Sequence, residues 1–416
     1  MQNKMELMSP VGSYESLTAA FQGGADSIYF GVGRLNMRSR SAHNFSESDI
    51  ATVASRCRER GVKCYLTLNT VVYDSEMSEM CSIVDQALRH GVSAIIASDM
   101  AVIAYCRQVG MEVHVSTQCN ISNYEALRFY AQFADVAVLA RELSLSAVAE
   151  ISRRALADDL RGPKGEPLRL EMFAHGALCM SVSGKCYLSL DNCNTSANRG
   201  ACVQLCRHAY TVCDKETGLE LDVDGEYIMS PKDLCTIGFI DKMKAAGVSV
   251  LKIEGRGRSA DYVRVVTECY REAIDTLAAG TYSRERVGEW TARLATVFNR
   301  GFWDGYYLGR KLGEWSDRYG SQATEQKVYL GRVTNYFNRI AVAEAKLETA
   351  ETFAVGDKLM VTGDTTGVYT CVPSELRTDR GAVGQVRQGE KFSFLTSEVL
   401  HRGDKVYKVI TSIDPF

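Results

Sequence analysis

The chain has 416 residues, of which 46% are hydrophobic and 24% charged, so it is long enough for more than one domain with a buried core. It contains no run of 18 apolar residues, which excludes an ordinary membrane-spanning helix. The formal net charge of −3 argues against a protein that coats nucleic acid non-specifically, although a local basic patch for one RNA is compatible with it.

The N-terminal residues, MQNKMELMSPVGSYESL, lack the basic segment and the apolar stretch of a secretory signal. We therefore expect a cytoplasmic protein in a reducing environment, where disulfides are rare. In that environment, clustered cysteines are typical of metal ligands or redox groups.

Short apolar segments alternate with helix-like segments over the first three quarters of the chain. The predicted strands are Met5–Ser9, Ser27–Val32, Lys63–Asn69, Ala94–Ser98, Glu112–Thr117, Val136–Ala140, Leu168–Ala174 and Ser249–Glu254. The predicted helices are Glu47–Arg60, Met77–His90, Ala101–Gly110, Tyr124–Phe133, Leu143–Ala155, Leu234–Ala246 and Ala260–Ala279. Several helices are followed by a glycine that enters the next strand, as in RGVKCYL and HGVSAII, which is typical of helix C-caps.

Eight strands in alternation with helices predict a closed (β/α)8 barrel of the TIM type. An open doubly wound sheet is the alternative, but no GxGxxG dinucleotide motif follows the first strand. In a barrel, chemistry takes place on the loops that follow the strands. These loops carry polar candidates for one shared site: Arg38, Arg40, Gln118, Asn120, His175, Glu254, Arg256 and Arg258.

A cysteine-rich insertion follows the seventh predicted strand. Seven of the 14 cysteines fall between positions 179 and 235, in a segment rich in Gly, Ser and Asn that cannot bury so many thiols. The spacing Cys179-x6-Cys186-x15-Cys202-x3-Cys206 offers four thiolates without a CxxC pair. It indicates a metal centre, with iron–sulfur and zinc both open.

The pattern changes after Tyr307. Residues 313–327 are polar and without a period, which predicts a linker. From Lys327 on, apolar residues alternate at period two between Gly-Asp turns, which predicts a small antiparallel β-barrel. The predicted domains are therefore a catalytic barrel over 1–312 with its insertion at about 175–232, and a β-barrel over 328–416.

Several long motifs resemble those of the collagenase-like "peptidase" family. They are EMFAHGALCMSVSGKCYLS at 171–189, NRGACVQLCR at 198–207, KIEGRGRSADY at 252–262, ELMSPVG at 6–12, STQCN at 116–120 and NRGF at 299–302. The resemblance covers essentially the whole chain. It implies an oxygen-independent hydroxylase with a [4Fe–4S] cluster, and the length and the C-terminal domain are most similar to the branch that hydroxylates the wobble uridine of tRNA with prephenate.

The resemblance also implies site residues. Its cluster ligands fall on Cys179, Cys186, Cys202 and Cys206, with Cys235 as the alternative fourth ligand and Cys193 without a role. Prephenate is a dicarboxylate, which suits forked contacts from Arg38, Arg40, Arg256 and Arg258. Gln118 and Asn120 are further candidates for substrate binding, and Tyr187, Tyr262 and Phe302 for stacking on an extruded uracil.

His175 is a candidate proton donor or acceptor, with Glu254 and Arg256 as the other catalytic candidates. The expected partners are tRNA, prephenate and an unidentified electron donor, and no membrane. Two alternatives stay open at this point: a peptidase, for which neither GxSxG nor HExxH occurs, and an RNA-binding protein stabilised by zinc.

Overall fold

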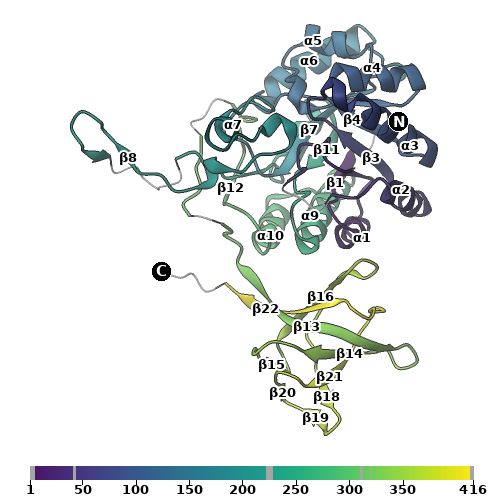
Figure 1. The fold of residues 1–416 in the computed structure, drawn as a ribbon, viewed down its shortest axis with the longest axis vertical. Helices are drawn as coiled ribbons and strands as arrows, with labels where there is room; N and C mark the ends of the chain where they lie inside the picture. Colours follow the sequence, from purple (N-terminus) through teal and green to yellow (C-terminus); the bar gives the residue numbers. More distant parts are fainter. Residues whose placement is uncertain (1–4, 41–43, 222–227, 310–312, 319, 413–416) are drawn as a thin grey trace.

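The computed structural model describes residues 5–40, 44–221, 228–309, 313–318 and 320–412. Residues 222–227 of the predicted insertion, and the predicted domain ends at 1, 312 and 416, lie outside the described residues. Eight parallel strands form a closed barrel in the order β11-β1-β2-β3-β4-β5-β6-β7, and β7 pairs with β11 to close it (Figure 1). The barrel strands are β1 (Glu6–Pro10), β2 (Ser27–Gly31), β3 (Lys63–Leu68), β4 (Ala94–Ala97), β5 (Val113–Val115), β6 (Val136–Val138), β7 (Arg169–Gly176) and β11 (Val248–Ile253). The predicted (β/α)8 barrel is confirmed.

Helices cover the outside of the barrel. They are α1 (Tyr14–Gln22), α2 (Asp49–Glu59), α3 (Met77–His90), α4 (Met100–Val109), α5 (Tyr124–Tyr130), α6 (Leu145–Ala157), α8 (Ile240–Ala245), α9 (Ala260–Ala278) and α10 (Arg284–Ala295). The glycines predicted to end helices adopt the left-handed conformation, with φ of +78° at Gly91 and +77° at Gly110. Their backbone amides donate to carbonyls of the last helical turn, so each helix stops where its strand must begin.

One predicted helix is wrong at its start. We predicted a helix over Leu234–Ala246, but Asp233–Cys235 form strand β10, and α8 begins only at Ile240. β10 runs antiparallel to the end of β7, with Cys235 opposite His175. It pairs on its other side with β12 (Phe302–Trp303). This pairing joins the two ends of the insertion. Because it depends on residues far apart in the sequence, the local helical pattern could not predict it.

The insertion between β7 and β10 has little regular structure. It contains α7 (Leu188–Cys193), three-residue 3₁₀ turns at Ala197–Arg199 and Leu205–Arg207, and the strands β8 (Val212–Cys213) and β9 (Glu220–Leu221). The β8–β9 pair extends away from the barrel (Figure 1). The segment from Cys179 to Arg207 lies over the carboxyl end of the barrel.

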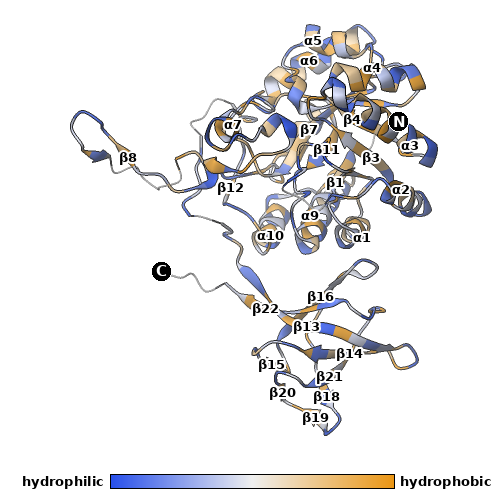
Figure 2. Cartoon of the chain, viewed as in Figure 1, coloured by the Kyte–Doolittle hydropathy of each residue, from blue (hydrophilic) through white to orange (hydrophobic). Residues whose placement is uncertain are grey.

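The C-terminal domain is an antiparallel sheet, as predicted. Its eight-stranded order is β17-β16-β22-β13-β14-β21-β18-β19. The strands are β13 (Glu325–Phe337), β14 (Val342–Leu347), β15 (Phe353–Ala354), β16 (Lys358–Gly363), β17 (Gly367–Cys371), β18 (Leu376–Thr378), β19 (Gly381–Val383), β20 (Gln385–Val386), β21 (Lys391–Leu395) and β22 (Lys405–Thr411). Apolar and polar residues alternate along these strands, as Figure 2 shows, and buried side chains such as Leu330, Val361 and Phe392 form a core separate from that of the barrel.

Within the described residues, every helix is too short or too polar to cross a lipid bilayer.

Candidate active site

A cavity of about 610 Å³ lies at the carboxyl end of the barrel, between the insertion and the segments that follow β2 and β11. Four of the seven clustered cysteines line it: Cys179, Cys186, Cys202 and Cys206. Cys179 comes three residues after β7, whereas the other three reach the cavity from irregular parts of the insertion. Among the described residues, Cys193, at the exposed end of α7, and Cys235, in β10, do not line this cavity.

The insertion is held in place by close contacts with the barrel loops. Gly200, with φ of +78°, packs so tightly that a Cβ atom there would overlap the backbone carbonyl oxygen of Asn36. Next to it, the guanidinium of Arg199 donates to both carboxylate oxygens of Glu76, over 2.5 and 2.7 Å. These contacts fix the NRG turn that leads into Cys202.

A second anchor involves two predicted substrate-binding residues, Gln118 and Asn120. Asn120 adopts the left-handed conformation, and its side-chain amide donates to the backbone oxygens of Gln118, at 2.7 Å, and Ser183, at 3.3 Å. The Ser183 hydroxyl accepts a hydrogen bond from Arg141. Gln118 and Asn120 thus support the Cys179–Cys186 segment and do not line the cavity.

The thiols interact electrostatically with one another and with arginines. At Cys179, enclosure by the protein raises the pKa, but Arg141 and Arg38 outweigh it and hold the pKa below the usual thiol value. At Cys206, burial raises the pKa, and the neighbouring Cys179, Cys202 and Cys186 raise it further. Deprotonated sulfur is the metal-binding form, so the arginines favour ligation at Cys179, whereas a cationic metal centre would be needed to hold all four thiolates together.

The four thiols are distributed around the cavity wall. In the described part of the chain, no three His, Cys, Asp or Glu donors converge closely enough to hold one ion. An iron–sulfur cluster makes a different demand, because its four thiolates each bind a different iron atom. Four cysteines around the wall of one cavity therefore fit a cluster as donor set.

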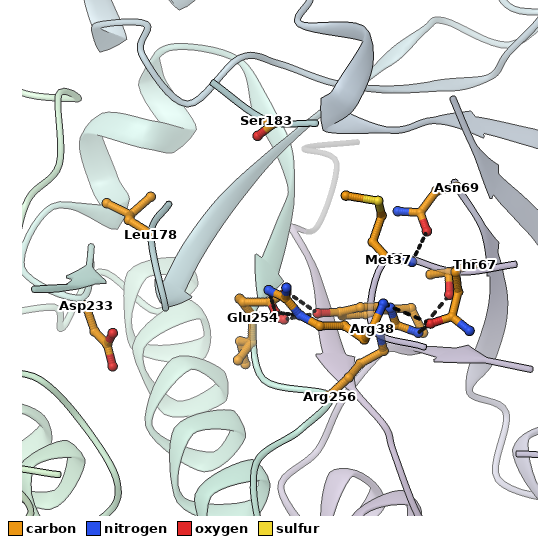
Figure 3. A network of polar contacts seen from close by, with 12 residues as sticks. Met37, Arg38, Thr67, Asn69, Leu178, Ser183, Asp233, Glu254 and Arg256 are labelled. Atoms are coloured by element: carbon orange, nitrogen blue, oxygen red, sulfur yellow. Dashed lines mark hydrogen bonds and ion pairs between the residues drawn. The ribbon is translucent and has the colours of Figure 1, made fainter. Parts of the chain in front are cut away.

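The predicted residues after β2 and β11 form an ion pair at the edge of the cavity (Figure 3). Arg38 donates to the Glu254 carboxylate from Nη2 over 2.6 Å and from Nε over 3.0 Å, and Tyr29 donates to the same carboxylate over 3.1 Å. Burial raises the pKa of Glu254, but Arg38 outweighs this effect and the pKa falls to about 2. Glu254 is therefore an anion at neutral pH, held by Arg38 and not poised to donate a proton.

Arg256 lies under this pair, away from the cavity lining. Its guanidinium donates to Thr67 Oγ1 over 2.9 Å and to Asn36 Oδ1 over 3.1 Å (Figure 3). Burial lowers its pKa to about 10, which still leaves it charged at neutral pH. A Cβ at Gly31 of β2 would overlap the Arg256 side chain, which thus joins the segment after β11 to strand β3 and to the loop after β2.

His175 is the last-but-one residue of β7 and is 1% exposed. Its ring lies among Tyr262, Tyr270 and Phe302, with centroid separations of 5.6 to 6.0 Å, and its Nδ1 is 3.5 Å from the Tyr270 hydroxyl. Burial lowers its pKa to about 3, so the imidazole is neutral and packed behind the cavity wall.

The remaining predicted residues divide between surface, interior and cavity. Arg40 is exposed and contributes its backbone amide to Gly200. Tyr187 lines the cavity and is 73% exposed, whereas Tyr262 is buried and donates to the Glu254 backbone oxygen. Arg258 lines the cavity, stacked 3.5 Å over the ring of Phe298.

Sequence reasoning missed Arg207 and Arg300 as parts of this wall. Both lie inside the motifs that carry the family resemblance, Arg207 directly after Cys206 and Arg300 in NRGF. This position in the motifs could have identified them as site residues. Arg207 is held by the backbone oxygens of Leu178 and Pro231, and Arg300 lies 3.4 Å from the carboxylate of Asp233.

Known protein sequences are similar to this chain over most of its length. The model of the family described as Peptidase family U32 matches residues 12–317. A protein named collagenase from Porphyromonas gingivalis is 56% identical over 406 residues, 98% of this chain and 98% of the relative. The tRNA hydroxylation protein P1 of Bacillus subtilis is 33% identical over 341 residues, 80% of this chain and 78% of that protein. The solved structure of the U32 peptidase Mk0906 is 13% identical with a TM-score of 0.35, over 42% of this chain and 71% of that one. With a family model and relatives that both extend over most of its length, the chain belongs to peptidase family U32.

Proposed function

We propose that this protein is an oxygen-independent RNA hydroxylase that forms 5-hydroxyuridine at the wobble position of tRNA, with a [4Fe–4S] cluster and prephenate. The observation that carries the proposal is the cavity at the carboxyl end of the barrel, whose wall contains Cys179, Cys186, Cys202 and Cys206. Similarity to a tRNA hydroxylation protein over 80% of the chain supports the choice of substrate.

The four cysteines would hold the cluster, which when bound supplies redox chemistry at a potential set by its surroundings. The protein contributes the charges around it. Arg38 and Arg141 favour the thiolate at Cys179, and Glu254 fixes the orientation of Arg38. A cavity of about 610 Å³ has room for a nucleobase or a small acid beside the thiols.

Prephenate carries two carboxylates, so it requires cationic partners in the cavity. Lys185 lines the cavity and makes no ion pair with the described residues. Arg38 uses Nε and Nη2 for Glu254, which leaves Nη1 for a ligand. We assign the carboxylates of prephenate to these two side chains.

The family name and the collagenase relatives raise a peptidase as the other candidate, but the geometry disfavours it. Cysteine catalysis needs a thiolate beside an imidazolium. Cys235 and His175 form one adjacent cysteine–histidine pair, opposite each other in β10 and β7. Burial raises the pKa of Cys235 to about 11 and lowers that of His175 to about 3, so both are neutral and inactive as a nucleophile–base pair.

The test is nucleoside analysis by mass spectrometry of tRNA from a strain that lacks the gene. We expect 5-hydroxyuridine derivatives to disappear and to return with the wild-type gene but not with Cys202→Ser. A matched control is Cys193→Ser, which alters an exposed cysteine outside the cavity and should restore the modification. Undiminished 5-hydroxyuridine in a strain that also lacks every paralogue would contradict the proposal.

A further inference from the structure

A second cavity, of about 450 Å³, adjoins the thiol-lined one. The two share part of their walls, namely Cys202, Gln204, Arg207, Arg258 and Arg300. The second cavity differs in character because four guanidinium groups line it, from Arg207, Arg258, Arg300 and Arg318. A ligand that fills both cavities would extend from the arginines to the cysteines.

Two of these guanidinium groups lie against one aromatic ring. Arg258 lies 3.5 Å and Arg300 lies 5.1 Å from the ring centroid of Phe298. Stacking on a ring fixes the plane of a guanidinium while its edge N–H groups stay available to an acceptor.

The described residues do not pair with every guanidinium of this wall. The Arg300 guanidinium forms an ion pair with the Asp233 carboxylate at 3.4 Å. Arg207 donates to Ser230 and to the backbone oxygens of Leu178 and Pro231. Arg258 makes no side-chain hydrogen bond or ion pair with the described residues. Burial lowers the pKa of Arg258, the negative charge of Asp233 opposes this effect, and the positive charge of Arg300 lowers the pKa further. Packing like charges together is costly unless an anion joins them.

We propose that this second cavity binds a backbone phosphate of the RNA substrate, with Arg258 as its main contact. The inference rests on the proposed function, since it assigns the neighbouring cavity to the base that reacts. A phosphodiester presents two charged oxygens that match the fork of a guanidinium. The shared wall then lets one nucleotide extend from its phosphate in the arginine-lined cavity to its base beside the thiols.

The test is binding of a fluorescent anticodon stem–loop RNA to the full chain, measured by anisotropy at several salt concentrations. We expect Arg258→Gln to weaken binding about tenfold and to reduce the slope of log K against log salt by about one phosphate contact. Arg258→Lys should recover part of the affinity. The matched control is Arg377→Gln, which removes an exposed arginine of the C-terminal domain and should change neither quantity. If Arg258→Gln does not fold, Arg318→Gln carries the same expectation at the edge of the cavity.

Three results would overturn the phosphate site. One is that the arginine variants bind the RNA with the same affinity and the same salt dependence as the wild type. This result would not contradict the proposed reaction. Another is that prephenate competes with the RNA for the wild-type chain but not for Arg258→Gln, while the variant binds the RNA with unchanged affinity. The arginines would then bind prephenate and not the RNA. The third is a wild-type chain that does not bind the RNA, which would overturn the proposed function as well. Weaker RNA binding by the variants, together with undiminished 5-hydroxyuridine in a strain that also lacks every paralogue, would support the phosphate site and contradict only the proposed reaction.

Discussion

At the scale of single residues, the site depends on charges that the fold brings together from distant parts of the sequence. Arg38 and Glu254 are 216 positions apart, yet they form a two-contact ion pair at the cavity edge. The sequence places both as polar residues at strand ends, and the fold brings them into contact. Their pairing changes the interpretation of Glu254 from a catalytic candidate to a fixed anion that orients Arg38.

The first prediction at this scale concerns the fourth cluster ligand. Cys206 lines the thiol cavity, whereas Cys235 lies in β10 beside Tyr270. We therefore expect Cys206→Ser to remove most of the iron from anaerobically prepared protein, and Cys235→Ser to retain it. Iron and sulfide analysis measures both. The reverse pattern would show that the chain closes the cluster with Cys235.

The second prediction concerns Glu6 at the opposite end of the barrel. Its carboxylate accepts hydrogen bonds from Arg169 over 2.5 Å, Tyr65 over 2.7 Å and Lys63 over 3.2 Å. Burial raises its pKa, but these partners, Arg169 above all, lower it from 4.5 to about 2. The unfolded chain thus binds the proton more tightly, so the stabilisation is present above about pH 4.5 and is lost as the pH falls toward 2.

Glu6→Gln should accordingly lower the free energy of unfolding by about 3 kcal/mol at pH 7 and by clearly less at pH 3. Urea unfolding at the two pH values tests this. An equal loss at both would mean that the carboxylate charge does not stabilise the fold.

At the scale of elements, the barrel strands were predictable because they are short buried runs, and β4 and β5 each follow a helix that ends at a left-handed glycine. Three helices were not predicted: α1, α7 and α10. α10 buries only Trp290 and Leu294, so its apolar stripe is weak, and α1 and α7 are short. The β10 strand depends on pairing with His175 and Gly176, across the whole insertion. The spacing of the four cysteines indicated a common site, but only the fold reveals that Arg207 and Arg300 belong to the same wall.

The NRG turn before Cys202 gives a prediction at this scale. Gly200 and Gly165 have nearly the same backbone angle, with φ of +78° and +77°, but no atom lies within 4 Å of the Cβ position at Gly165. Gly165→Ala should therefore cost about 1 kcal/mol for the left-handed conformation alone. Gly200→Ala should cost about 3 kcal/mol or more, because its methyl group would also meet Asn36.

Thermal unfolding measures the stability of both variants, and iron content reports whether Cys202 still reaches the cluster. Equal stability and equal iron content would mean that the contact between the turn and the Asn36 loop does not position the cysteine segment.

At the scale of the whole molecule, the C-terminal domain is packed against the barrel and is not a loose appendage. Val368 of β17 belongs to the barrel core, and the Gln22 side chain of α1 exchanges hydrogen bonds with the backbone of Thr366 and Val368. Lys405 forms an ion pair with Glu15 over 2.9 Å. The period-two pattern predicted the strands of this domain, but its docking on α1 and α9 is a long-range contact that no local pattern encodes.

The docking can be tested with two valines. Val368 is 2% exposed, whereas Val372 is 58% exposed just after the same strand. Val368→Asp would bury a carboxylate in the interface and should cost about 3 kcal/mol or more, with faster proteolytic cleavage within residues 313–318. Val372→Asp should behave like the wild type. Similar proteolysis of the two variants would contradict the docked arrangement.

The central claim is that the cavity formed by the insertion holds an iron–sulfur cluster on Cys179, Cys186, Cys202 and Cys206. The most direct measurement is metal and sulfide analysis of the full chain after anaerobic purification or reconstitution, with its visible spectrum before and after dithionite. The account predicts brown protein with four irons and four sulfides per chain and an absorbance that dithionite bleaches. Colourless protein with one zinc per chain and no iron would contradict it.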